Sequence, residues 1–186
     1  MQRMANYDSL TGLPNRSLFS HLVDQMLVEA RRARKSGRYG ALMVIEVDRI
    51  GAVSDTLGHD IAGELLCEIG RRLRDADIRT RIDGSKFAVA LPTIDNIEHV
   101  GIVARKLLAT LAQPVLIDAH DGARIDAHIL RVGARIGVAV CLEDGTDTAT
   151  LLRFADVAMA KVQRGGDEGF LFYSQEMDPR ARRRPA

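Results

Sequence analysis

Apolar residues recur along this chain with the periods of amphipathic helices and of buried strands. Between Asn15 and Arg34 they fall at three- and four-residue spacing, which predicts a helix with Asn15 as its N-terminal cap. The same spacing predicts further helices at 60–74, 96–111 and 148–162. Short apolar runs predict strands at 40–48, within 79–91, and at 115–118, 124–129, 136–140 and 170–173.

Turn signals join several of these strands into hairpins. Asp83-Gly84 divides the segment 79–91 into two strands, and Asp121-Gly122 joins the next pair. The order of predicted elements is then α-β-α-β-β-α-β-β-β-α-β. Helices and strands that alternate in this way pack as layers, so the predicted fold class is an α/β (α+β) sandwich and not a bundle or a barrel.

Length and charge narrow the range of functions. The chain has 186 residues, which is typical of one domain with a short appendage. Apolar residues make up 46% and charged residues 27%, so a core can form and wholesale disorder is excluded. The 26 basic and 25 acidic residues leave a net charge of +1. A nearly neutral chain has no general attraction to nucleic acid or to an anionic membrane, and we expect neither as a partner.

The N-terminus and the cysteines indicate a cytoplasmic protein. No apolar run approaches the roughly 20 residues that span a bilayer, and residues 1–6 lack the apolar core of a signal peptide. The two cysteines, Cys67 and Cys141, both lie in apolar-patterned segments. Two are too few for a disulfide framework or a metal cage, so we expect both to be reduced core residues.

Residues 7–16 read YDSLTGLPNR and form the most specific string in the chain. Within it, Asp8 and Arg16 are placed to pair across a Gly-Pro turn that leads into the first long helix, and the alternative is an ordinary capped turn. The string resembles the opening of the GGDEF domain family, the bacterial diguanylate cyclases. The segments IEVD (45–48), DTLGHDIAG (55–63) and ADVAM (155–159) resemble later motifs of that family in the same order. The resemblance implies a palm-like, mostly antiparallel β-sheet flanked by helices, similar to that of nucleotide cyclases.

The resemblance also implies a chemistry to compare with the residues present. In the family, two GTP molecules bound by two facing domains are condensed to cyclic di-GMP. That reaction needs divalent metal held by carboxylates, because the triphosphate charge must be neutralised and the attacking hydroxyl activated. The resemblance places one metal ligand at Glu46, where the family has Asp. It places the other in the hairpin at 83–87.

That hairpin reads Asp83-Gly84-Ser85-Lys86-Phe87 and departs from the family signature at three positions. Asp83 replaces the first Gly, Ser85 replaces the metal-binding Asp, and Lys86 replaces the Glu. A serine hydroxyl is neutral, and a lysine reverses the charge beside the expected metal. We therefore expect no intact catalytic residue here and no cofactor, with Mg²⁺ only if GTP binding persists through Glu46.

Positions that the resemblance assigns to the nucleotide depart as well. Ser54 replaces the Asn that reads guanine, and Glu64 replaces an Asp with a longer carboxylate. Cations expected at the phosphates are replaced by Gly51, Gln163 and Asp167. Each charge-assisted contact of this kind contributes about 1.5–3 kcal/mol, so we expect no GTP turnover. The former nucleotide pocket then consists of Glu46, Asp48, Ser54 and Glu64.

A second string spells part of the signature in another place. Residues 165–168 read GGDE, but they lie between the last predicted helix and the last predicted strand, whereas the family hairpin joins two adjacent strands. We therefore interpret this string as the C-terminal cap of the helix and a turn.

Arg74 and Asp77 lie in an RDAD string nine residues before the hairpin. The spacing matches the inhibitory RxxD motif that binds cyclic di-GMP in the family. A guanidinium and a carboxylate suit the phosphate and guanine groups of that ligand. Alternatively, Arg74 is a solvated residue at a helix end, where the helix dipole favours cations. The sequence leaves both interpretations open.

The C-terminal residues indicate the domain organisation. We expect residues 1–174 to form the GGDEF-like domain and residues 175–186 to form a basic connector. Residues 172–184 resemble the segment that leads from a GGDEF domain into a cyclic di-GMP phosphodiesterase (EAL) domain, and no EAL sequence is present in this chain. The expected partners are an adjacent EAL-type domain or signalling protein, cyclic di-GMP, and a second copy in a homodimer.

The leading hypothesis from the sequence is a degenerate GGDEF domain that acts as a regulatory or interaction module in cyclic di-GMP signalling. One alternative is a weakly active diguanylate cyclase that uses Glu46, Asp48 and Glu64. The other is a sensor that binds GTP without turnover.

Overall fold

The computed structural model describes residues 5–76, 78–121, 124–162 and 169–177. Its centre is a five-stranded sheet in the order β2-β3-β1-β6-β7. The strands are β1 (Tyr39–Val47), β2 (Ile78–Asp83), β3 (Lys86–Ile94), β6 (Ala134–Val140) and β7 (Phe170–Phe172). Only the β6–β7 pair is parallel among these strands, so the predicted palm-like, mostly antiparallel sheet is confirmed.

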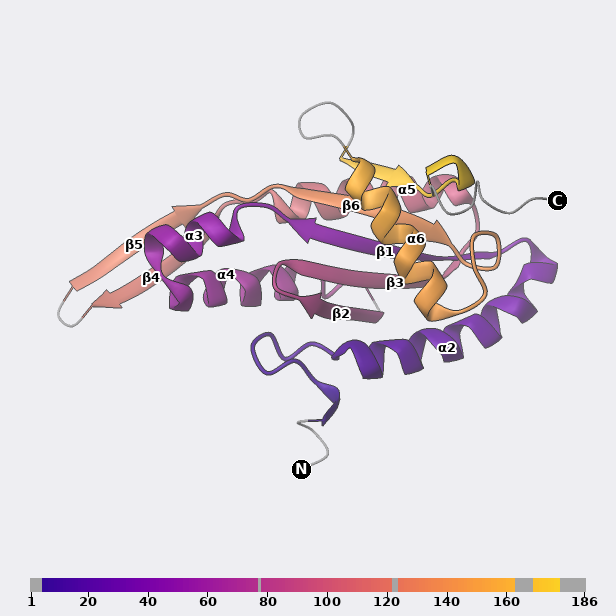
Figure 1. Cartoon of the computed structure of the whole chain (residues 1–186), viewed down its shortest axis with the longest axis horizontal. Coiled ribbons are helices and arrows are strands. Elements are labelled where there is room, and N and C mark those ends of the chain that lie inside the picture. Colours follow the sequence, from indigo (N-terminus) through magenta and orange to yellow (C-terminus); the bar gives the residue numbers. More distant parts are fainter. Residues whose placement is uncertain (1–4, 77, 122–123, 163–168, 178–186) are drawn as a thin grey trace.

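Helices cover both faces of this sheet (Figure 1). They are α2 (Arg16–Ala33), α3 (Ile50–Leu57), α4 (His59–Arg72), α5 (Ile97–Leu111) and α6 (Thr148–Lys161). Alternate residues of β1 point to opposite faces, as in any strand. Leu42 and Val44 pack in one apolar cluster with α2 and α6, and Met43 and Ile45 pack in the other with α4 and α5.

The remaining strands form a separate two-stranded sheet. β4 (Val115–Asp121) and β5 (Arg124–Leu130) pair antiparallel and extend away from the central sheet beside α3 and α4 (Figure 1). Val115 and Ile117 are buried on the side of this hairpin that faces the core. The sequence predicted this hairpin but not its separation from the main sheet.

Local signals set the ends of the helices. The Asn15 side chain accepts a hydrogen bond from the backbone N–H of Leu18, which confirms the predicted cap of α2. Asp147 caps α6 in the same way through the N–H of Thr150. The predicted α/β sandwich is therefore confirmed, with each predicted helix and strand present.

One helix was missed, and two expectations about individual residues were wrong. Helix α3 was not predicted, because it spans only eight residues and contains Gly51. Cys141 is buried as expected, but Cys67 is half-exposed, and its thiol lies 3.1 Å from the carbonyl oxygen of Leu10. Asp8 pairs with Arg81 on β2 and not with Arg16, because the turn folds back onto the sheet.

Candidate functional site

The hairpin between β2 and β3 projects from the central sheet and is anchored by Phe87. This ring is fully buried, and Phe87 lies opposite Ile45 on β1. Asp83 and Gly84 form the exposed tip, where Gly84 has a positive φ of 28°. A glycine allows this backbone conformation without steric cost, so the Asp83-Gly84 turn forms without strain.

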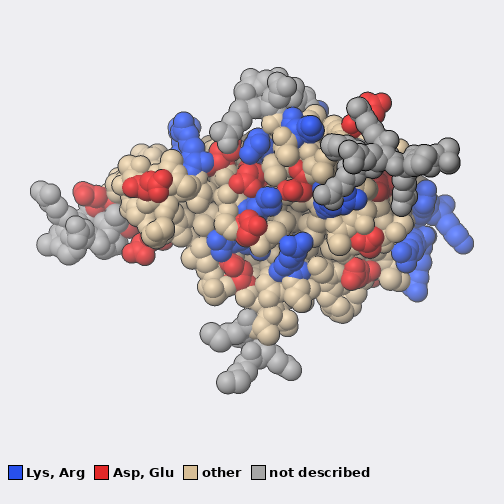
Figure 2. All heavy atoms as spheres, viewed as in Figure 1, with Lys and Arg blue, Asp and Glu red and all other residues tan. Residues whose placement is uncertain are grey.

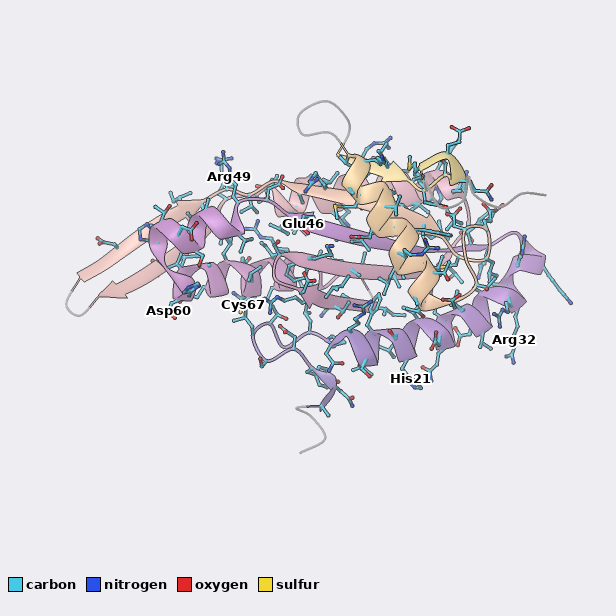
Figure 3. The ribbon with its side chains drawn as sticks, in the orientation of Figure 1. His21, Arg32, Glu46, Arg49, Asp60 and Cys67 are labelled. Atoms are coloured by element: carbon cyan, nitrogen blue, oxygen red, sulfur yellow. The ribbon has the colours of Figure 1, made fainter. Side chains whose placement is uncertain are left out.

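Ser85 and Glu46 are in direct contact beneath this tip. The Ser85 hydroxyl donates a hydrogen bond to the Glu46 carboxylate over 2.6 Å. Figure 3 labels Glu46 on β1, the central strand, beside the hairpin. Glu46 lies opposite Lys86 on β3 and opposite Arg135 on β6. Its carboxylate therefore lies between two cationic strand positions, because directly opposed residues share one face of a sheet.

Lys86 joins the hairpin to α6 through an ion pair. Its ammonium lies 2.9 Å from a carboxylate oxygen of Asp156. The close contact with Asp156 raises the pKa of Lys86, against burial, which would lower it, and the charges of Asp83 and Glu46 raise it further. The lysine therefore stays cationic throughout the neutral pH range.

A second ion pair lies at the end of β1. The Nε of Arg135 lies 3.7 Å from a carboxylate oxygen of Asp48, and both side chains are about four-fifths buried. Figure 2 shows blue and red side chains interspersed over the face that α6 crosses, without a large field of either sign. The acidic residues of this region are therefore accompanied by cations from neighbouring elements.

These residues fit a divalent cation poorly. Mg²⁺ is held in proteins by one or two carboxylates together with waters and substrate phosphates. The Glu46 carboxylate already accepts the Ser85 hydroxyl, and Lys86 is its cross-strand neighbour. Across the described ranges, no group of three or more His, Cys, Asp or Glu side chains is placed to hold a metal ion.

Two further residues that the resemblance assigned to a nucleotide pocket, Ser54 and Glu64, lie on the two helices after β1. Ser54 on α3 is hydrogen-bonded to Nδ1 of His59 over 2.7 Å. Glu64 on α4 is exposed and has no hydrogen bond or ion pair with any residue that the structure describes. Neither side chain is hydrogen-bonded to Glu46 or Ser85 among the residues that the structure describes.

The opening segment braces the hairpin from outside. Asp8 accepts hydrogen bonds from the backbone N–H and the hydroxyl of Thr11, and Arg81 lies 3.3 Å from the same carboxylate. Arg81 also donates to the carbonyl oxygen of Gly84 at the tip. Burial would raise the pKa of Asp8, but the Thr11 hydrogen bonds and the Arg81 charge together lower it.

The RxxD string is described only in part. Arg74 follows the end of α4 and is exposed, and its guanidinium makes no hydrogen bond or ion pair with the described residues. Asp77 lies outside the described residues, as do Gln163, the GGDE string at 165–168 and most of the predicted connector. The predictions made for those positions stay predictions.

Two residues of the site, Arg135 and Asp156, were missed by sequence reasoning. Arg135 comes from β6 and Asp156 from α6, about 90 and 110 positions after Glu46. Strand pairing brings Arg135 opposite Glu46, and α6 packs across β6 and β1. The available signal for Asp156 was the ADVAM segment (155–159), in which it is the second residue.

None of the helices in the described part of the chain is long and apolar enough to cross a membrane.

The chain is similar to proteins that make or degrade cyclic di-GMP. The family model described as diguanylate cyclase, GGDEF domain, matches residues 5–169. Cyclic di-GMP phosphodiesterase NbdA of Pseudomonas aeruginosa is 30% identical over 185 residues, which cover 97% of this chain and 22% of NbdA. Diguanylate cyclase TpbB of the same species is 30% identical over 168 residues, which cover 88% of this chain and 36% of TpbB. The chain thus spans between a fifth and two-fifths of these relatives.

The fold has a close counterpart among solved structures. The isolated GGDEF domain of TpbB superposes with a TM-score of 0.79 at 27% identity, covering 96% of this chain and 99% of that domain. The sheet and helices described above are therefore those of a known domain type.

Proposed function

The chain belongs to the diguanylate cyclase GGDEF domain family, and within that family we propose that it acts as a non-catalytic regulatory module of bacterial cyclic di-GMP signalling. In this role the domain does not condense GTP. It acts on a neighbouring domain or a partner protein through its folded surface.

The contact between Ser85 and Glu46 carries this proposal. A metal-dependent cyclase needs free carboxylates at the hairpin, because the cation must meet both protein and triphosphate oxygens. Here the Glu46 carboxylate accepts the Ser85 hydroxyl over 2.6 Å, with Lys86 opposite it on β3. The Lys86 ammonium is in turn held by Asp156. The hairpin carboxylate and ammonium are therefore already engaged by groups of the protein itself, where a cyclase would leave them for metal and triphosphate.

The relatives support the signalling context. NbdA is described as a cyclic di-GMP phosphodiesterase and TpbB as a diguanylate cyclase, so domains similar to this one occur in proteins that degrade and make the same nucleotide. We propose that residues 1–174 are the GGDEF domain and that residues 175–186 connect it to an EAL-type domain. Two unpaired cysteines agree with a cytoplasmic location, which we also propose.

A cyclase assay tests the absence of turnover. Purified protein with Mg²⁺ and GTP is expected to form no cyclic di-GMP, whereas TpbB measured in parallel serves as the active control. Clear turnover by this chain would overturn the proposal. The matched variant Ser85→Asp/Lys86→Glu restores two carboxylates at the hairpin. We expect it to bind Mg²⁺–GTP more tightly than the wild type in isothermal titration, even without turnover.

Cyclic di-GMP binding through Arg74 and Asp77 is a second candidate function. Arg74 favours it, because its exposed guanidinium is not engaged by any described residue and can form a fork with a phosphate. In isothermal titration with cyclic di-GMP, Arg74→Ala is expected to abolish binding. The exposed Arg71, which pairs with Glu68, provides the control Arg71→Ala. Binding that responds to Glu46→Ala instead would assign the ligand to the former nucleotide pocket, and no binding would leave the domain as a protein-interaction module.

A further inference from the structure

The outer face of the β4–β5 hairpin is apolar at its centre and uncovered. Leu116 and Ile129 lie directly opposite each other in this two-stranded sheet, and they are 66% and 70% exposed. The opposite face, with Val115 and Ile117, is buried against the core. Two large apolar side chains paired on an exposed strand face are unusual, because a lone hairpin gains its stability by covering such a face.

A groove continues this apolar face towards α3. It has a volume of about 610 Å³ and is lined on one side by Ile129, Leu130 and Arg131. On the other side it is lined by one face of α3, on which apolar residues and Arg49 recur at helical spacing. No residue of α3 is fully buried. Figure 3 shows Arg49 pointing outward from the start of this helix.

Charges of opposite sign flank the apolar centre at equal spacing. Arg131 follows Ile129 by two residues towards the base of the hairpin, and Asp118 follows Leu116 by two residues towards its tip. Two strand residues span about 7 Å. Both side chains belong to exposed residues, and neither is paired with any residue that the structure describes.

We propose that this face binds the same face of a second copy of the chain. With a two-fold axis through the Leu116–Ile129 pair, the two hairpins pack antiparallel, with Ile129 of one copy against Ile129 of the other. The same operation brings Asp118 of each copy to Arg131 of the other.

Self-complementarity favours a second copy over a different protein. A two-fold interface requires one patch to supply both halves of every contact. This patch does so, because its centre is apolar and its two flanks carry one anion and one cation at matching distances. A groove for an unrelated acidic helix would need cations on both flanks and no exposed aspartate.

Sedimentation velocity over a range of concentrations tests the proposal on the 186-residue chain. We expect a concentration-dependent monomer–dimer equilibrium in the absence of nucleotide. Ile129→Asp is expected to raise the dimer dissociation constant at least about tenfold, because it places two buried charges at the centre of the interface. Ile102→Asp is the matched control, since Ile102 is 55% exposed on α5, away from the hairpin. Circular dichroism checks that both variants stay folded.

Charge reversal distinguishes this interface from any other dimer. Asp118→Arg and Arg131→Asp are each expected to weaken association roughly fivefold, because each reversal makes two rim contacts repulsive. The double variant restores opposite charges across the interface and is expected to recover the wild-type dissociation constant. A wild-type chain that remains monomeric at about 1 mM would overturn the proposal, and the face would then be left for a different protein. A dimer that Ile129→Asp does not weaken would overturn it as well.

Discussion

At the scale of single residues, the Asp8 carboxylate ties the opening segment to the hairpin. It accepts two hydrogen bonds from Thr11 and pairs with Arg81, which in turn holds the carbonyl oxygen of Gly84. Because the pKa of Asp8 is lowered on folding, its contribution to stability is fully present above its unfolded value near 3.8 and is lost as the pH falls through the folded value.

Asp8→Asn is therefore expected to lower the free energy of unfolding by about 1–3 kcal/mol at neutral pH. The difference between variant and wild type shrinks below about pH 4, where the wild-type carboxyl also becomes protonated. Urea unfolding at a series of pH values measures it. Asp95→Asn is the control, because the Arg38–Asp95 pair is exposed on both sides and contributes little. A pH-independent difference would contradict this account.

Sequence reasoning singled out only part of the site. Glu46, Ser85 and Lys86 were named from the resemblance, and the structure shows a hydrogen bond between Ser85 and Glu46. Arg135 was not predicted, because it lies far from the hairpin in the sequence, and Asp156 lies in the ADVAM segment but was not assigned to the site. They reach it through strand register and the packing of α6, which a string does not encode.

At the scale of elements, the approach of α6 to β6 depends on Gly137. A Cβ atom at this position would lie 1.8 Å from the carbonyl oxygen of Ala155 and 2.3 Å from the backbone nitrogen of Met159. Backbone atoms cannot move aside as a flexible side chain does. Gly137→Ala therefore forces α6 away from the sheet, which we expect to cost about 3 kcal/mol or more.

Gly51→Ala is the matched control for that substitution. Gly51 lies in α3 with no atom within 4 Å of an added Cβ, so alanine there should leave stability unchanged or raise it by up to about 1 kcal/mol. Thermal and urea unfolding compare the two variants. Equal effects at both glycines would contradict the close contact between α6 and β6.

Arg72 links three elements and gives a second prediction at this scale. Its guanidinium donates hydrogen bonds to the carbonyl oxygens of Thr110, Gln113 and Pro114, at the end of α5 and the start of β4. Arg72→Met keeps the apolar stem but leaves these carbonyls without a charged donor, so we expect a loss of about 2–4 kcal/mol. Arg71→Met, at a side chain that is 67% exposed, should cost little. Equilibrium urea unfolding measures both.

The helices and strands were the features that the sequence predicted best, with helix α3 as the exception. Helices α2, α5 and α6 carry long periodic apolar faces with polar caps, and each was predicted to within about two residues. Helix α3 has neither feature, because it follows Arg49 in a left-handed conformation with φ of 70° and lacks a side-chain cap. The spacing of Ile50, Val53 and Leu57 was its remaining signal.

At the scale of the whole molecule, the central sheet and the β4–β5 hairpin differ in how they are held. Strand β1 is paired on both sides and covered by helices on both faces, whereas the hairpin has two strands and one buried face. Local opening costs least where few apolar contacts and few strand pairs must break. We therefore expect the amide hydrogens of β4 and β5 to exchange faster than those of β1, β3 and β6.

Hydrogen exchange followed by mass spectrometry can test this order and the proposed dimer together. In dilute protein the amide hydrogens of the hairpin peptides should exchange first. Their protection should rise as the protein concentration approaches the dimer dissociation constant, because a second copy then buries Leu116 and Ile129. Peptides from β3 report the central sheet and should not change with concentration. In Ile129→Asp the hairpin should stay fast at every concentration. If instead the wild-type hairpin exchanged as slowly as β1 in dilute protein, its stability would come from its own chain, and the exposed pair would not need a partner.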